Sequence, residues 1–171
     1  MKSYKFETTN EYFDYLDFHD CFVEKIQVGI DVIIIDFEYV NISEQHPLNP
    51  YKVAKSTGQC RLTFNEVAFS KAFLYIDLNP VLISDWEEEE EDEEESEFEE
   101  KQVLITDLVE MEFLKFEEKR VENDCFIFEI FGLDWRTHGG FCGLRIHAKN
   151  FTLQWNELTD DAWYVGWDNQ E

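Results

Sequence analysis

The sequence predicts an all-β fold, either an antiparallel sandwich or an open barrel, with one or two short helices and an acidic loop inserted between strands. Apolar residues recur at every second position through much of the chain, as they do in half-buried strands. Short runs of this kind follow one another with turn residues between them, which is typical of hairpin-connected antiparallel sheets. Two stretches, around residues 10–16 and 159–164, suggest short helices.

The first predicted hairpin spans residues 22–40. Apolar side chains alternate along Ile33–Tyr39, and Gly29–Asp31 can close a turn onto the preceding strand. Residues 59–69 are expected to form one strand, with a bulge that keeps its apolar side chains on a single face. The intervening stretch 43–58, which is interrupted by prolines and a glycine, is expected to be a long loop.

Further strands are predicted in the second half of the chain. Extended structure is expected over 103–105 and over 109–116, and 125–133 is apolar on both faces, as in a central strand covered on both sides. The strand 141–148 is expected to direct Leu144 inward and His147 outward.

The chain is expected to form one domain, residues 1–171, in which 84–100 is a mobile acidic insertion. Asp85–Glu100 holds thirteen carboxylates among sixteen residues. Such dense like charge cannot form a core element, so it serves either as a solubilising spacer or as a docking segment for a basic groove. In the docking interpretation, aromatic anchors and carboxylates of the tract contact the partner: Trp86, Glu88, Glu90, Asp92, Glu94 and Phe98.

The formal net charge is −25, and removing the thirteen acids of the tract leaves −12, so the remainder of the chain is acidic too. This charge either serves solubility alone or steers the chain toward a basic protein. Nucleic-acid binding is not expected, because the few Lys and Arg residues are scattered. No signal peptide and no membrane-spanning run is recognised, and a cytoplasmic location with reduced cysteines is expected.

His19 and Asp20 form the most suggestive short cluster. A carboxylate beside an imidazole can serve a metal site or acid–base chemistry, but it can also form a turn that leads into a strand. The four histidines and four cysteines show no metal-ligand spacing, and no phosphate loop or nucleophile elbow is present. Neither a metal nor a cofactor is expected.

Trp163 and Trp167 lie in an aromatic-rich stretch near the end of the sequence. They form either a segment that closes the core or, if exposed, a patch of the kind found at binding hot spots.

Near the start of the chain, an aromatic-His-Asp triplet leads into an alternating strand pair. The residues that carry this pattern are Phe18, His19, Asp20, Cys21, Val23, Ile26 and Ile33–Phe37. The pattern resembles the opening of small bacterial β-proteins, some of which are similar to immunity proteins of polymorphic toxin systems. The resemblance covers about twenty residues and assigns no chemistry to them. It implies a cytoplasmic protein that blocks the positively charged cleft of a toxin, such as a nuclease, by stoichiometric binding.

The sequence therefore predicts a non-catalytic protein that binds a basic protein partner through acidic surface, with immunity against a toxin as the specific form. Two alternatives stay open. One is a metal-dependent hydrolase that uses His19 and Asp20, and the other is a regulatory module whose polyacidic tract acts as a tether.

Overall fold

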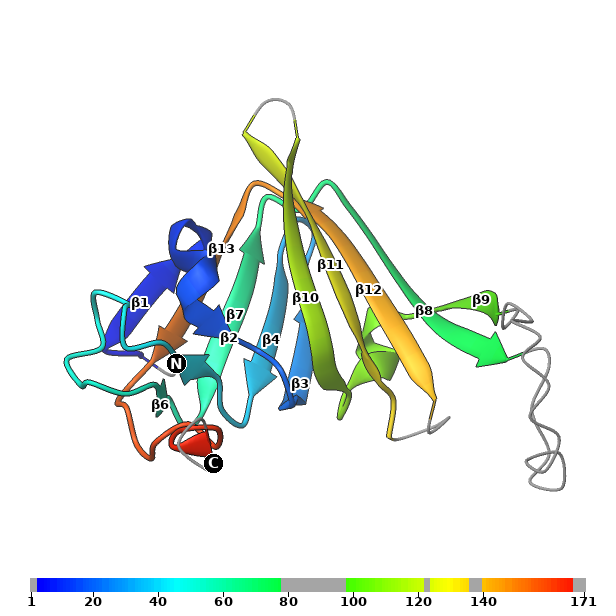
Figure 1. Cartoon of the computed structure of the whole chain (residues 1–171). Helices are drawn as coiled ribbons and strands as arrows, with labels where there is room; N and C mark the ends of the chain where they lie inside the picture. The colour runs from blue at the N-terminus through cyan, green and yellow to red at the C-terminus, as the bar shows by residue number, and fades with distance from the viewer. Residues whose placement is uncertain (1–2, 78–97, 122–123, 136–139, 168–171) are drawn as a thin grey trace, which may run out of the picture.

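The computed structural model describes residues 3–77, 98–121, 124–135 and 140–167 (Figure 1). Most of the acidic tract lies outside these ranges. The predicted contact residues Trp86, Glu88, Glu90, Asp92 and Glu94 therefore have no structural description.

The described strands form one large antiparallel sheet and one small one. The large sheet has ten strands in the order β1 (Phe6–Thr9), β13 (Asn150–Trp155), β7 (Cys60–Asn65), β4 (Ile33–Phe37), β3 (Cys21–Val28), β10 (Glu112–Val121), β11 (Cys125–Leu133), β12 (Phe141–Ala148), β8 (Phe69–Asp77) and β9 (Phe98–Val103). The small sheet contains β2 (Leu16–Asp17), β5 (Asn41–Ile42) and β6 (Lys55–Ser56). The predicted all-β antiparallel architecture is confirmed, and the large sheet is open, with β1 and β9 at its two ends.

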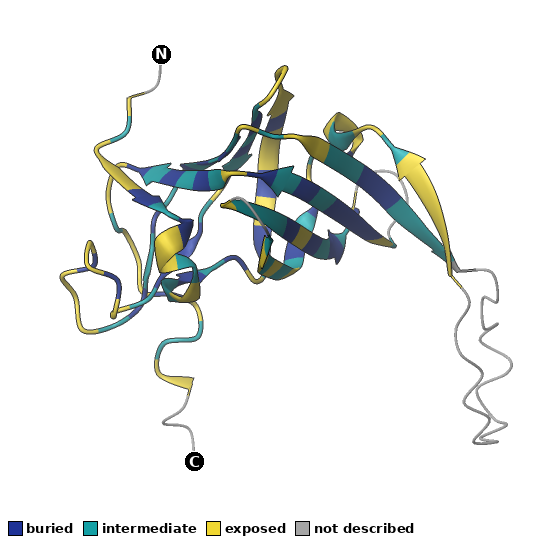
Figure 2. Ribbon diagram, turned by 90° about the horizontal axis from the view of Figure 1, so that it is seen from above, coloured by how far each residue is buried: buried dark blue, intermediate teal, exposed yellow. Residues whose placement is uncertain are grey.

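The large sheet curls over its own core. In Figure 1, β7 and β4 lie to the left of β10, and β11 and β12 lie to its right. Aromatic rings from these two halves of the sheet meet in the core. The ring centroid of Phe64 lies 5.1 Å from that of Phe128, which in turn lies 5.5 Å from Phe151. Buried and exposed residues alternate along the strands (Figure 2), as the period-two pattern predicts.

The β7–β13 pair in one half of the sheet continues as the β8–β12 pair in the other half. The chain turns a corner between the end of β7 and the start of β8. At this corner Glu66 adopts a left-handed conformation with φ of 50°, and the Lys149 amide donates to the Asn65 carbonyl at 3.1 Å. The prediction of one bulged strand over 59–69 is therefore wrong. The chain changes direction after Asn65, and Phe69 begins β8 with its ring exposed.

Both short helices in the described residues are 3-10 helices. One of them, η1 (Asn10–Tyr15), lies where a helix was predicted, and the Thr9 hydroxyl caps it by accepting from the Glu11 amide at 3.3 Å. The helix predicted over 159–164 is wrong, since that segment forms bends and turns. The second helix, η3 (Ile105–Leu108), lies between the two stretches predicted to be extended and overlaps only the last residue of the first, and the Asp107 carboxylate accepts from the Leu104 amide at 3.0 Å.

Two further expectations need correction. Residues 98–100, predicted as the end of the acidic insertion, form the first half of β9, because they pair in continuous register with β8. Strand β11 is central in the sheet, as predicted, but its outward side chains are half-buried or exposed and not covered as expected. By contrast, Leu144 is buried and His147 lies on the outer side of β12, as predicted.

All four cysteines are free thiols, and Cys21, Cys60 and Cys142 are buried. Burial raises the pKa of the Cys60 thiol to about 12. Among the described helices, none combines the length and apolar character needed to cross a membrane.

Candidate protein-binding site

The two predicted tryptophans project from a turn that is fastened to the small sheet. The Ala162 amide donates to the Ala54 carbonyl at 2.9 Å, and the Ser56 amide donates to the Asp160 carbonyl at 2.8 Å. With the backbone held there, Trp163 stays 41% exposed and Trp167 62% exposed. Their rings meet edge to face with centroids 5.0 Å apart. The core-closing interpretation of these residues is therefore wrong, and the exposed alternative describes them.

The fold brings the His19–Asp20 cluster to the same surface. The His19 ring centroid lies 6.5 Å from that of Trp163. Neither cluster shows this proximity in the sequence, because it depends on how the segment after β13 docks against β6. We call the surface formed by His19, Trp163, Tyr164 and Trp167 the tryptophan patch.

Most of the contacts of His19 and Asp20 are those of a turn that leads into β3. The His19 amide donates to the Asp17 carboxylate at 2.9 Å, and the ring Nδ1 donates to the Leu114 carbonyl at 2.8 Å. Asp20 has a φ of 62°, which aspartate tolerates better than most residues. The remaining ring nitrogen, Nε2, lies 3.4 Å from the Asp20 Oδ1.

Among the described residues, no third ligand accompanies this pair. Within the part of the chain that the structure describes, no group of three His, Cys, Asp or Glu side chains is arranged to hold a metal ion. A catalytic zinc site uses three protein ligands, so one imidazole and one carboxylate provide an incomplete set. His147 does not extend the pair, since its ring packs against Phe69 at a centroid distance of 5.1 Å.

The tryptophan patch lies in a negative environment. Burial, and then the carboxylates of Asp17 and Glu44, raise the pKa of the Tyr164 hydroxyl to about 12. Both carboxylates act on a residue that stands between the two tryptophans in sequence. The patch therefore combines exposed aromatic rings with nearby acids, which suits a partner that is basic around an apolar pocket.

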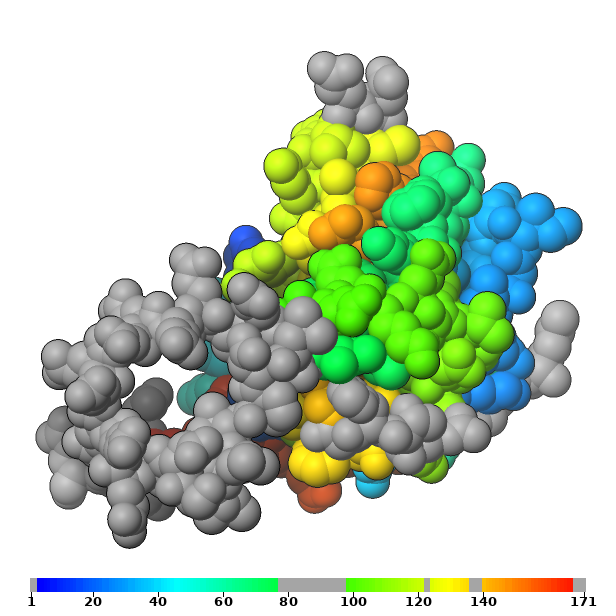
Figure 3. Space-filling view, turned by 90° about the vertical axis from the view of Figure 1, so that its right-hand side faces the viewer, coloured from blue at the N-terminus to red at the C-terminus, as the bar shows by residue number. Residues whose placement is uncertain are grey.

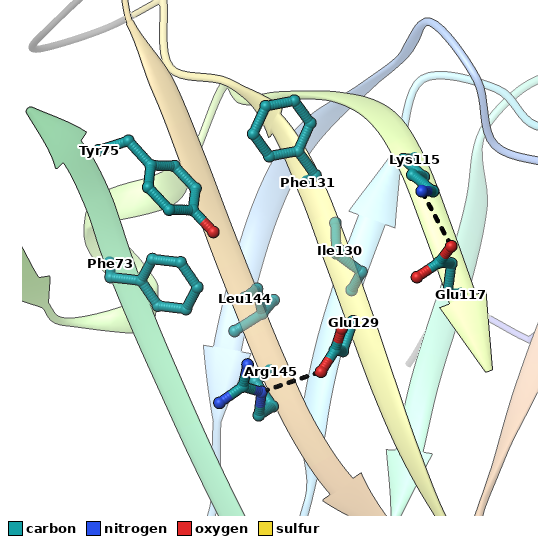
Figure 4. Close-up of a pocket in the computed structure, with 9 residues that line it drawn as sticks. All are labelled: Phe73, Tyr75, Lys115, Glu117, Glu129, Ile130, Phe131, Leu144 and Arg145. Atoms are coloured by element: carbon teal, nitrogen blue, oxygen red, sulfur yellow. Dashed lines mark hydrogen bonds and ion pairs between the residues drawn. The ribbon is translucent and has the colours of Figure 1, made fainter. Parts of the chain in front are cut away.

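A second aromatic surface lies on the outer side of the curled sheet (Figure 4). Phe73 and Tyr75 of β8 point toward β12, and Phe131 of β11 stands on the far side of that strand. The ring centroids of Phe73 and Tyr75 are 5.0 Å apart, and those of Tyr75 and Phe131 are 5.8 Å apart. These rings border a hollow of about 390 Å³, which we call the aromatic cleft.

Gly143 makes room for this arrangement. It pairs with Phe73 on one side and with Phe131 on the other. A Cβ atom at position 143 would lie 2.5 Å from the Phe73 Cε2, so only glycine lets the ring lie over the β12 backbone. The sequence analysis missed the cleft, although a glycine inside a strand pattern is a signal of close approach.

The aromatic cleft and the tryptophan patch differ in their electrostatics. In the cleft, the Arg145 Nε lies 3.2 Å from the Glu129 Oε1, and the Lys115 Nζ lies 3.0 Å from the Glu117 Oε1. Each of these carboxylates already faces a cation of the same chain, so the cleft attracts a basic partner less than the tryptophan patch does.

Phe98 is the one predicted anchor of the acidic tract that falls within the described residues. It is 45% exposed, and its ring lies 6.5 Å from that of Tyr75 at the border of the cleft.

Comparisons with protein-family models, with curated proteins and with solved structures found no match. The resemblance to immunity proteins therefore stays a prediction.

Proposed function

We propose that this chain is a non-catalytic binding protein whose tryptophan patch engages a basic protein. The observation that carries the proposal is the pair of exposed tryptophans, whose ring centroids lie 5.0 Å apart. Tyr164, which follows Trp163, is close enough to the Asp17 and Glu44 carboxylates for them to help raise the pKa of its hydroxyl. Tryptophan is strongly enriched among residues that dominate binding energy, because its ring buries a large area at little conformational cost.

The net charge of −25 also supports a basic partner. A strongly negative surface speeds encounter with a positive one and disfavours acidic competitors. Charge brings the partner near, and the tryptophans then supply the apolar contact that holds it. Neither step requires a reacting group.

Within this class we propose an immunity-type role in the cytoplasm of a bacterial producer cell. The tryptophan patch would cover the positively charged cleft of a toxin and exclude its substrate, with one molecule bound for each molecule inhibited. The resemblance around Phe18, His19 and Asp20 supports this specific form.

The test is capture of a partner from a lysate of the native host at low and at moderately high salt, with three baits. The baits are the wild-type protein, Trp167→Ala and Trp135→Ala. Trp135 is a matched control, because it is 58% exposed, close to the 62% of Trp167, and is not part of the patch. We expect one basic protein to survive the salt wash with the wild type and the control. Trp167→Ala should weaken binding by about 2 kcal/mol, or roughly thirtyfold in Kd.

Loss of every protein at high salt with the wild type would overturn the proposal, since it would leave only nonspecific attraction to a polyanion. Equal capture by Trp167→Ala and the wild type would remove the patch from the interface. The immunity role has its own test. The captured protein should arrest growth when expressed alone, and coexpression of this chain should restore growth.

A further inference from the structure

The two ends of the large sheet are treated differently by the rest of the chain. At one end, a loop is fastened to β1, because the buried Thr8 hydroxyl accepts a hydrogen bond from the Nε2 of His46 at 2.8 Å. The Leu48 amide donates to the Nδ1 of the same ring at 3.0 Å, so the imidazole fixes the loop after β5 against this strand.

The other end is open within the described part of the chain. Strand β9 pairs with β8 on one side, and five of its six residues are exposed. Figure 3 shows the bright green atoms of this region at the surface on that side of the molecule. A terminal strand in this position presents unpaired backbone amides and carbonyls along its free side.

Strand β9 is also regular enough for a further strand to pair with its free side. It pairs with β8 through six consecutive residue pairs without a register shift. Its sequence, Phe-Glu-Glu-Lys-Gln-Val, contains no proline that would remove a backbone donor. Proteins protect a long edge with a β-bulge, a proline or charged side chains. Strand β9 has no bulge and no proline, and its protection lies in the charges of Glu99, Glu100 and Lys101.

Charge decides what can pair with this edge. Glu99 and Glu100 lie on opposite faces of β9, and Glu97 and the tract of acids come directly before the strand in the sequence. A second copy of the chain would bring the same acids to the contact, and like charges opposite one another destabilise strand pairing. A basic segment would meet them favourably. Glu99 is the more available of the two, because Glu100 already forms a long ion pair with the Lys71 Nζ at 3.8 Å, whereas Glu99 has no ion pair among the described residues.

We propose that β9 is the docking edge for an extended, basic segment of the partner, which adds to the large sheet as its next strand. This inference rests on the proposed function for the partner's basic character, and it adds the partner's conformation and a second contact surface. Lys or Arg side chains on one face of the added strand pair with Glu99. An apolar side chain opposite Phe98 extends the aromatic contact that this ring makes with Tyr75.

Synthetic peptides test strand addition without the natural partner. The probe is an amidated peptide of alternating Lys and Val that is long enough to span β9. One control peptide replaces Lys with Glu. A second keeps every charge but carries N-methyl groups on the Val amides, which removes donors along one edge of the peptide and disrupts strand pairing.

The readouts are affinity and amide hydrogen exchange at residues 98–103. The Lys-Val peptide should bind and slow exchange at alternate β9 amides. The N-methylated peptide should bind about tenfold more weakly or worse, and the Glu-Val peptide should not bind. Glu99→Lys combined with Glu100→Lys should abolish the protection. The matched variant Glu7→Lys with Glu11→Lys, which changes the net charge equally at the β1 end, should retain it.

Equal affinity for the methylated peptide, or binding without slower exchange in β9, would overturn strand addition and leave charge alone. Concentration-dependent dimerisation that protects β9 without peptide would instead show that a second copy occupies the edge, which also overturns the proposal. These outcomes do not involve Trp167. Failure of the edge and failure of the tryptophan patch are therefore distinguishable.

Discussion

Substitution of Gly143 by alanine tests how the aromatic cleft is built. The new methyl group would lie 2.5 Å from the Phe73 Cε2 and 2.6 Å from the Cζ. Carbon atoms in favourable contact are about 3.5–4.0 Å apart, so the ring must move by about 1 Å or leave its site. Phe73 is only 5% exposed, which means that the ring has substantial buried area to lose.

The expected cost follows from these contacts. Overpacking of this kind typically costs about 1–3 kcal/mol, and complete exposure of a phenylalanine loses about 2–3 kcal/mol of burial. We therefore expect Gly143→Ala to lower the free energy of unfolding by about 2 kcal/mol, with a fall in Tm of about 4–8 °C for a chain of this length.

A double-mutant cycle identifies the cause. Urea unfolding is measured for the wild type, Gly143→Ala, Phe73→Ala and the double variant. Phe73→Ala alone should cost about 3 kcal/mol. The double variant should cost no more, because the methyl group then occupies space that the ring has left. The coupling energy should be about 2 kcal/mol. Additive losses would refute the reasoning, since they would mean that residues 73 and 143 do not compete for space.

Three further predictions concern the strand core, the loop fastened to β1 and the acidic tract. Gly132→Ala places a methyl group against the Glu112 carbonyl oxygen, a backbone atom that cannot rotate away. Thermal unfolding should show a loss of stability of about 3 kcal/mol that Phe73→Ala does not rescue. An unchanged Tm would contradict this prediction. Burial lowers the pKa of His46, so below about pH 6.5 the unfolded chain binds a proton that the folded chain excludes, and stability present above that pH is lost as the pH falls. Unfolding measured at about pH 7.5 and about pH 5.5 should show a larger loss for the wild type than for His46→Gln, and equal losses would exclude this role. Deletion of residues 85–97, which leaves the β9 residues in place, should slow association with the captured partner but retain most of the affinity, as measured by surface plasmon resonance. Loss of nearly all affinity would favour the polyacidic tether.

The strands could be predicted because their signal is local. Ile33 and Ile35 alternate with residues that face outward, and the Gly29 amide closes the predicted hairpin by donating to the Val32 carbonyl at 2.8 Å. Burial on one face of a sheet imposes this periodicity on the sequence, so it can be recognised without knowing the neighbouring strands.

The site could be predicted only in pieces, because its geometry depends on contacts between distant segments. The sequence singled out both His19 and Trp163, but their proximity arises when the segment after β13 docks against β6. The aromatic cleft depends on the register that places Gly143 between Phe73 and Phe131. That register is set by a pairing of three strands, and no single stretch of sequence contains it.

The two proposed contacts should contribute to binding in different ways. The charges of Glu99 and Glu100 act at a distance, and salt screens them over about 10 Å at moderate ionic strength. They therefore affect mainly the rate of association. Trp167 acts only once its ring is covered, so its loss should appear mainly in the rate of dissociation. A partner held by both would associate more slowly as salt increases and dissociate at a nearly constant rate. Such a profile separates specific recognition from the general attraction that any chain with a charge of −25 exerts on basic proteins.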